Sequence, residues 1–135
     1  FWLNSALFSI ELLLNPKFWR ASAPDFWFIV NPNALNLEDE LQVISNLDVM
    51  LAMDSGNAHI AAMLGKKVIT IWGVTHPYAG FTPFNQPLDY ALVADRKSYP
   101  LIPTSIYGNK FPEGYENAAG SVSVATIVSK VREVC

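Results

Sequence analysis

The sequence predicts an α/β fold in which a parallel sheet carries helices on its faces. Short apolar runs rich in β-branched residues alternate along the chain with segments that have helical features, and the connections between them are short. Such an alternation is typical of parallel sheets with right-handed crossovers. With 135 residues, 51% of them hydrophobic and only 16% charged, the chain has the length and apolar content of one globular domain.

The first strand and the first helix are predicted in the N-terminal third of the chain. Residues 26–30 are aromatic and β-branched and lie between prolines, as is common for a strand. Asn36 is then a good N-cap, and the acidic residues 38–40 occupy the first helical turn, where the helix dipole favours them. This helix ends near Asn46. Its apolar face has a spacing of i, i+4 and i+7: Leu37, Leu41 and Ile44.

Two further strands and a short helix follow. Residues 48–53 and 68–72 are apolar runs that predict buried strands. Between them, residues 57–64 are rich in alanine and predict a helix that Gly65 closes. The order strand, helix, strand, helix, strand is what predicts the parallel sheet.

The C-terminal half of the chain has a different composition. Residues 88–94 predict one more strand, whereas residues 99–120 contain many Pro, Gly and Tyr residues and are expected to be irregular. A loop of that length in a compact domain is usually functional or poorly ordered. Ser123 is the expected N-cap of a final helix, one face of which is apolar: Val124, Ile127, Val128 and Val131.

Composition excludes some classes of function. A net charge of −3 without a basic cluster argues against nucleic-acid binding. The single cysteine, Cys135, can form no internal disulfide, which agrees with a reducing compartment. No apolar run is long enough to span a bilayer, and no signal peptide is recognised. The abrupt apolar start at Phe1, without an initiator methionine, leads us to expect a fragment whose partner domain is absent.

Polar residues follow two neighbouring strands of the predicted sheet. Residues 54–59 come directly after the strand at 48–53 and open into a helix, and the loop 73–81 follows the strand at 68–72. Both loops leave the sheet at its carboxyl edge, where open α/β sheets bind ligands. The helix N-terminus offers N–H groups and the positive end of a dipole to an anion. The sequence therefore predicts a site for a phosphate-bearing ligand.

The first loop leaves structural alternatives open. Asp54 either accepts hydrogen bonds from ligand hydroxyls or caps the helix. Ser55 and the backbone N–H groups of Gly56 and Asn57 are candidates to hold a phosphate oxygen. His59 lies in the first helical turn and either faces the ligand or is a structural residue.

The second loop contributes Thr75 and His76, a polar pair that we expect to make few packing contacts. No carboxylate or cysteine accompanies His59 and His76 at ligand spacing, so no metal site is predicted. Met53 stands where a serine hydrolase would need glycine. Neither G-x-G-x-x-G nor a Walker sequence is present.

Three segments resemble the C-terminal half of glycosyltransferase family 9, which includes the ADP-heptose:lipopolysaccharide heptosyltransferases. They are residues 37–41, 48–59 and 71–77, and they match the family signature Asp-(Ser/Thr)-Gly-x-x-His followed by Gly-x-Thr-x-Pro. The likeness covers residues 35–85 well, and residues 103–110 resemble a variant of one subgroup.

The resemblance implies the Rossmann-like donor-binding domain of an inverting glycosyltransferase of the GT-B type. In that reading Asp54 contacts sugar hydroxyls, residues 55–57 lie at the diphosphate and the sugar, and no metal or other cofactor is needed. The residues that the resemblance places against the nucleotide-sugar donor are Asp54, Ser55, Gly56, Asn57, His59, Gly73, Thr75 and His76.

The resemblance also implies partners. The donor would be an ADP-sugar, with heptose as one candidate sugar, and the acceptor a cell-surface glycan or glycolipid such as the lipopolysaccharide core. An N-terminal domain, expected to be absent here, would bind that acceptor and supply the catalytic base, so residues 1–135 are expected to form one partial domain that is inactive alone. The enzyme would be cytoplasmic, associating peripherally with the inner face of the bacterial inner membrane. Two alternatives are a GT-B nucleotide-sugar epimerase and a non-catalytic nucleotide-binding remnant.

Overall fold

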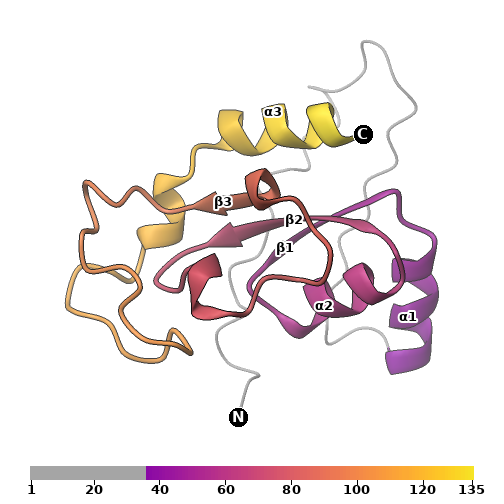
Figure 1. The fold of residues 1–135 in the computed structure, drawn as a ribbon, viewed down its shortest axis with the longest axis horizontal. Coiled ribbons are helices and arrows are strands. Elements are labelled where there is room, and N and C mark those ends of the chain that lie inside the picture. The colour runs from indigo at the N-terminus through magenta and orange to yellow at the C-terminus, as the bar shows by residue number, and fades with distance from the viewer. Residues whose placement is uncertain (1–35) are drawn as a thin grey trace. The chain divides into compact units, whose positions relative to one another are not determined.

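A computed structural model describes residues 36–135, of which Leu37–Cys135 form one compact unit. A sheet of three parallel strands lies at its centre, in the order β1 (Val49–Met53), β2 (Lys67–Trp72) and β3 (Ala91–Val93) (Figure 1). The predicted α/β class is confirmed. The strand expected at residues 26–30 lies outside the described residues.

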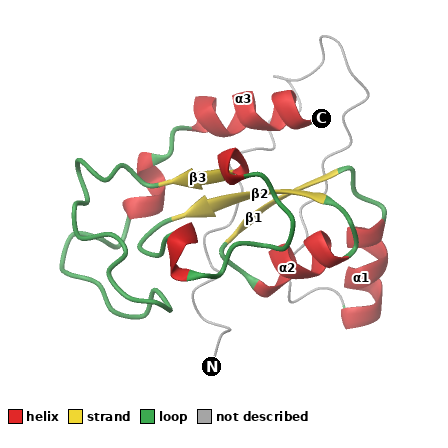
Figure 2. Cartoon of the chain, in the orientation of Figure 1, coloured by secondary structure: helices red, strands yellow, loops and turns green. Residues whose placement is uncertain are grey.

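Helices cover both faces of this sheet. Helices α1 (Leu37–Ser45) and α2 (Gly56–Met63) lie on one side, and α3 (Val124–Val134) lies on the other (Figure 2). The predicted helices at the start, the middle and the end of this part of the chain are thus confirmed, with boundaries shifted by one or two residues. None of the helices in the described part of the chain has the length and apolarity needed to cross a membrane.

Side chains of β2 alternate between the two layers, as the period of a strand requires. Val68 packs in a cluster with the alanines of α2, whereas Ile69 packs with Val131 and Val134 of α3. Five consecutive residues of this strand, 68–72, are buried. The run is continuously apolar apart from one threonine because both faces of the sheet are covered.

Small side chains let α2 lie close to the sheet. Its inward face consists of Ala58, Ala61 and Ala62, all of them buried. The helix ends at Met63, and Gly65, which follows the C-cap residue, has a φ of +73° and donates its N–H to the carbonyl of Ala62. A left-handed residue after a helix is most easily glycine, so the predicted helix end is confirmed.

The fourth predicted strand is only partly correct. Residues 91–93 pair with β2, but Leu88–Tyr90 form a 3-10 turn instead of strand. The side-chain amide of Gln86 occupies the edge of β2 that a longer strand would use: its Oε1 accepts from the N–H of Val68 at 2.9 Å and its Nε2 donates to the carbonyl of Lys66 at 3.1 Å. A side chain thereby replaces the first residues of the expected strand.

Helix α3 begins as predicted, with the Oγ of Ser123 accepting a hydrogen bond from the N–H of Thr126 at 3.1 Å. Its buried residues are Val131 and Val134. Of the residues on the predicted apolar face, Val131 is buried, whereas Val124 is 51% exposed. The helix packs on the sheet mainly through its C-terminal half.

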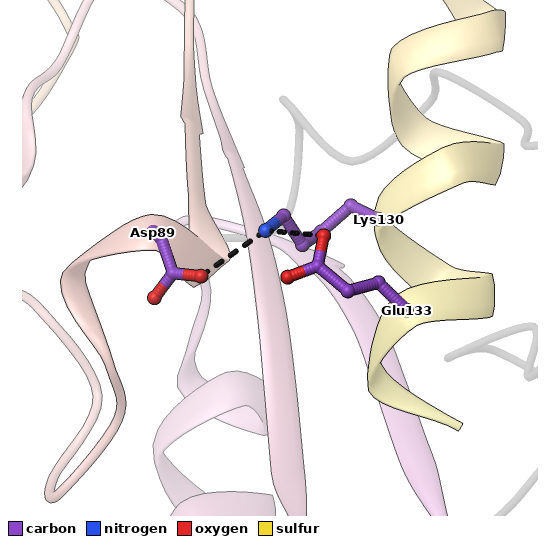
Figure 3. Close-up of polar contacts among 3 residues, drawn as sticks. All are labelled: Asp89, Lys130 and Glu133. Carbon is purple, nitrogen blue, oxygen red and sulfur yellow. Dashed lines mark hydrogen bonds and ion pairs between the residues drawn. The ribbon is translucent and has the colours of Figure 1, made fainter.

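An ion-pair cluster connects α3 to the turn before β3 (Figure 3). The ammonium group of Lys130 lies 3.1 Å from Asp89 Oδ2 and 2.9 Å from Glu133 Oε2. Hydrogen bonds to Glu133 and then to Asp89 raise the pKa of Lys130 above its usual 10.5. The charged lysine is thus favoured in the folded protein.

We expect Lys130→Met to lower the free energy of unfolding slightly, by less at high salt, because exposed ion pairs are weak and screened. The pKa of the lysine is raised on folding, so the wild type keeps this contribution at neutral pH and loses it as the pH rises through that raised value. Urea unfolding at low and high salt measures the difference. Lys110→Met, at an exposed lysine, is the control, and an equal loss in both variants would contradict this role.

Candidate functional site

The two polar loops meet at the carboxyl edge of the sheet. Asp54 directly follows β1, and Thr75 lies three residues after the end of β2. The pairing of Met53 with Ile71 places the ends of these two strands side by side. The Thr75 side chain lies close enough to the Asp54 carboxylate to act on it and lower its pKa. The predicted convergence of the two loops is therefore confirmed.

The environment of Asp54 is only partly aqueous. Burial raises the pKa of its carboxyl above the ordinary value, while the hydrogen bond from Thr75 and the charge of His59 act in the opposite direction. Asp54 is not the helix cap, since Ser55 occupies the N-cap position of α2. The capping interpretation of Asp54 is therefore wrong, and its carboxylate lies between the two loops instead.

The N-terminus of α2 lacks a side-chain cap. Ser55 has extended backbone angles, with φ −148° and ψ 161°, and its hydroxyl makes no capping hydrogen bond. A Cβ built on Gly56 would meet no atom within 4 Å, so there is open space beside the first turn. First-turn N–H groups with no capping side chain are suited to bind an anion that enters this space.

Asn57 has a structural partner. Its side-chain Nδ2 donates to Glu40 Oε1 at 2.8 Å in a partly buried contact that joins α2 to α1. The amide side chain is thus committed to helix packing. Only the backbone N–H of Asn57 remains a candidate for a ligand contact.

Thr75 and His76 are both buried, with 8% and 6% of their surface exposed. The prediction that this pair makes few packing contacts is wrong. His76 caps the 3-10 turn Pro77–Ala79: its Nδ1 accepts from the N–H of Tyr78 at 3.3 Å, and the two rings lie 4.7 Å apart. Burial, and then the charge of Arg96, lower the pKa of His76. Both effects favour the neutral ring, which the acceptor role of Nδ1 also requires.

Replacing His76 with alanine is expected to destabilise the fold by about 1 kcal/mol, the usual cost of a lost cap. Because the pKa of His76 is lowered on folding, its contribution is present above pH 6.5 and is lost as the pH falls through the folded value. Denaturant unfolding at pH 7.5 and pH 5 measures both effects. His76→Asn keeps an acceptor and is the matched control; equal losses for Ala and Asn would contradict the capping role.

Close packing accounts for glycine at position 73, and the sequence did not reveal this contact. A Cβ on this residue would lie 3.3 Å from the Cβ of Ala119, which belongs to the 3-10 turn Ala118–Ser121. The distal segment thus approaches the strand end closely at Gly73. A donor contact for this residue remains a prediction.

Arg96 also lies at this edge and was not predicted as a site residue. Val93 pairs with Trp72, and the N–H of Ala94 donates to the Trp72 carbonyl at 3.0 Å, so the residues after β3 run beside those after β2. The guanidinium of Arg96 acts electrostatically on His76. A basic residue just after a strand was the available signal.

Within residues 36–135, no group of three or more His, Cys, Asp or Glu side chains is arranged to hold a metal ion. The arrangement at this edge instead combines one half-buried carboxylate, a hydroxyl and uncapped backbone N–H groups. Such a set suits a ligand that carries both hydroxyls and an anionic group.

Comparison with known proteins identifies the family. The model of glycosyltransferase family 9 (heptosyltransferase) matches residues 27–102, which is more than half of the 135 residues. The match includes β1, α2, β2 and both polar loops. Neither the curated proteins nor the solved structures contain a significant match. On the family match, the chain belongs to glycosyltransferase family 9.

Proposed function

We propose that the carboxyl edge of the sheet binds the nucleotide-sugar donor of a glycosyl transfer. The observation that carries this proposal is the contact between Asp54 and Thr75, which brings the two family motifs together beside the uncapped start of α2. Asp54 accepts hydrogen bonds from sugar hydroxyls, and the first-turn N–H groups, with Ser55, bind the diphosphate. Family membership supports the reaction class.

The donor that we propose is ADP-heptose, and the acceptor a cell-surface glycan such as the lipopolysaccharide core. The heptosyltransferase description of the family supports this choice. Acceptor binding and the catalytic base are assigned to a separate N-terminal domain. The enzyme works on the cytoplasmic face of the bacterial inner membrane, with which it associates peripherally.

The proposed chemistry is a displacement with inversion. The acceptor oxygen forms a bond to the anomeric carbon as the bond from that carbon to the diphosphate oxygen breaks. The acceptor proton passes to the base, and the nucleoside diphosphate leaves with the electron pair. The dipole and N–H groups at the start of α2 (Gly56–Met63) stabilise this leaving group without a metal ion.

An assay of the intact protein, with the proposed N-terminal domain included, with ADP-heptose in the presence and absence of acceptor tests the function. We expect ADP release and a glycosylated product only when the acceptor is present. Conversion of the donor sugar without acceptor would favour the epimerase instead. Calorimetric titration with ADP and ADP-heptose separates binding from catalysis, and no heat with either ligand would favour the non-catalytic remnant.

A further inference from the structure

We propose that Gly108 is a positioning residue of the donor site, which acts through Thr75 on Asp54. The inference rests on the proposed function, since Asp54 is the residue that contacts the donor there. It adds a residue from the long C-terminal connection, outside both family motifs.

The segment that contains Gly108 is docked on the second motif loop. The N–H of Thr104 donates to the carbonyl of Val74 at 3.0 Å, and the Thr104 hydroxyl lies 3.4 Å from the same oxygen. At the other end of the loop, the rings of Phe81 and Tyr107 lie 5.8 Å apart. A backbone hydrogen bond and an aromatic contact thus hold this segment against residues 73–81.

Only glycine fits at position 108. Its φ is +64°, and a Cβ built there would lie 2.9 Å from Thr75 Cγ2 and 3.5 Å from Val74 Cγ2. The Cα of Gly108 therefore packs directly against the methyl group of Thr75. No other glycine in the described part of the chain has a Cβ position this close to a neighbouring atom.

This contact fixes the orientation of the Thr75 hydroxyl. Threonine is β-branched, so one χ1 angle places both its methyl and its hydroxyl group. With the methyl against Gly108, the hydroxyl is the part of the Thr75 side chain that is left to act on the Asp54 carboxylate, whose pKa it lowers. The Thr75 hydroxyl favours the ionised carboxylate against the effect of burial, and the electrostatic effect of His59 acts in the same direction. Gly108 thereby keeps Asp54 charged and oriented.

Donor affinity of four variants in the native protein tests the proposal. We expect Gly108→Ala to raise the Kd for ADP-heptose by about tenfold, since coupling between contacting residues is typically worth 0.5–3 kcal/mol, or about 2- to 150-fold. Gly114→Ala is the matched control, because Gly114 has a φ of +86° and no atom within 4 Å of its Cβ position. The Gly114→Ala substitution imposes a similar backbone strain and should change the Kd for ADP-heptose by less than about twofold.

A rescue separates the contact from general damage. Thr75→Ser removes the methyl group and keeps the hydroxyl. As a single substitution it should weaken donor binding, because no methyl group packs against Gly108. Combined with Gly108→Ala, it should restore most of the affinity that Gly108→Ala loses, because the added Cβ then has no methyl group to clash with. If Gly108→Ala does not fold, Thr75→Ser carries the test, and wild-type affinity in that variant overturns the proposal. Equal Kd values for Gly108→Ala and Gly114→Ala overturn it as well.

A titration without donor distinguishes this proposal from the proposed function. Carboxyl ¹³C NMR should show a higher pKa for Asp54 in Gly108→Ala than in the wild type or in Gly114→Ala, and a pKa near that of the wild type in the double variant with Thr75→Ser. An unchanged Asp54 pKa in Gly108→Ala overturns the positioning role. Wild-type binding of ADP-heptose by Asp54→Ala would instead overturn the donor site itself, whatever the titration shows.

Discussion

Replacing Asp54 with asparagine is expected to weaken donor binding by about 10- to 100-fold and, at neutral pH, to stabilise the protein. A hydrogen bond to a charged group contributes about 1.5–3 kcal/mol, so loss of the charge on a residue that binds sugar hydroxyls has a large effect. Asparagine keeps the size of the side chain and an oxygen that can accept from Thr75. The loss of affinity therefore reports the charge and not a collapse of the loop.

The effect on stability follows from the pKa of Asp54. Burial raises this pKa above 3.8, so the folded protein binds the proton more tightly than the unfolded chain does. The stabilisation that this provides is full below pH 3.8 and is lost as the pH rises through the raised pKa. At pH 7 burial of the ionised carboxylate lowers the stability of the folded protein relative to the unfolded chain, and the neutral amide relieves that cost. Urea unfolding of wild type and Asp54→Asn at pH 7 and near pH 3.5 should show a gain only at the higher pH.

Asp95→Asn is the matched control because folding lowers the pKa of Asp95, whereas it raises that of Asp54. The hydroxyl of Ser98, then the backbone N–H of Lys97, lower the pKa of Asp95, which is exposed on the turn after β3. The folded state thus favours the charged form above pH 3.8, and the substitution should lower stability at pH 7 with donor affinity unchanged. If Asp54→Asn lost stability at pH 7 and kept its donor affinity, the carboxylate would be structural and the proposed donor site would be wrong.

Local patterns were sufficient to predict most of the fold. The apolar runs around β1 and β2, the alanine-rich helix between them and the Ser123 cap are all features of neighbouring residues, and each was correctly predicted. The length of β3 was not, because it depends on Gln86, whose amide pairs with a strand edge 18 residues earlier in the sequence. No periodicity encodes a contact of that kind.

The candidate site was likewise predictable only in part. Placing Asp54 and Thr75 at one edge required only the rule that parallel strands end together. The packing that surrounds them could not be predicted, since Gly108 and Ala119 approach the loop after β2 from more than 30 residues away. The burial of His76 was also missed; the loop that contains it accepts a backbone hydrogen bond from Thr104, which lies 30 residues further along the chain than its partner Val74.

Truncation of Trp72 to alanine is expected to cost about 3–5 kcal/mol of unfolding free energy, the largest stability effect among these variants. Its side chain is fully buried at the carboxyl end of β2, where the N–H of the indole donates to the hydroxyl of Thr70 at 2.8 Å. Total stabilities of domains are about 5–15 kcal/mol, so the loss is a large share of the total. Denaturant unfolding of both proteins measures it.

The indole N–H and the indole volume can be separated. Trp72→Phe keeps most of the volume but leaves the hydroxyl of Thr70, a residue only 2% exposed, without its donor, which should cost about 1–3 kcal/mol. Adding Thr70→Val removes the unpaired hydroxyl and should recover part of that loss. If Trp72→Phe and Trp72→Ala were equally destabilising, volume would not matter at this position. Since Trp72 immediately precedes the loop that contains Thr75, a cavity there should also loosen the contact with Asp54, and the donor Kd of Trp72→Ala should rise more than that of Trp72→Phe.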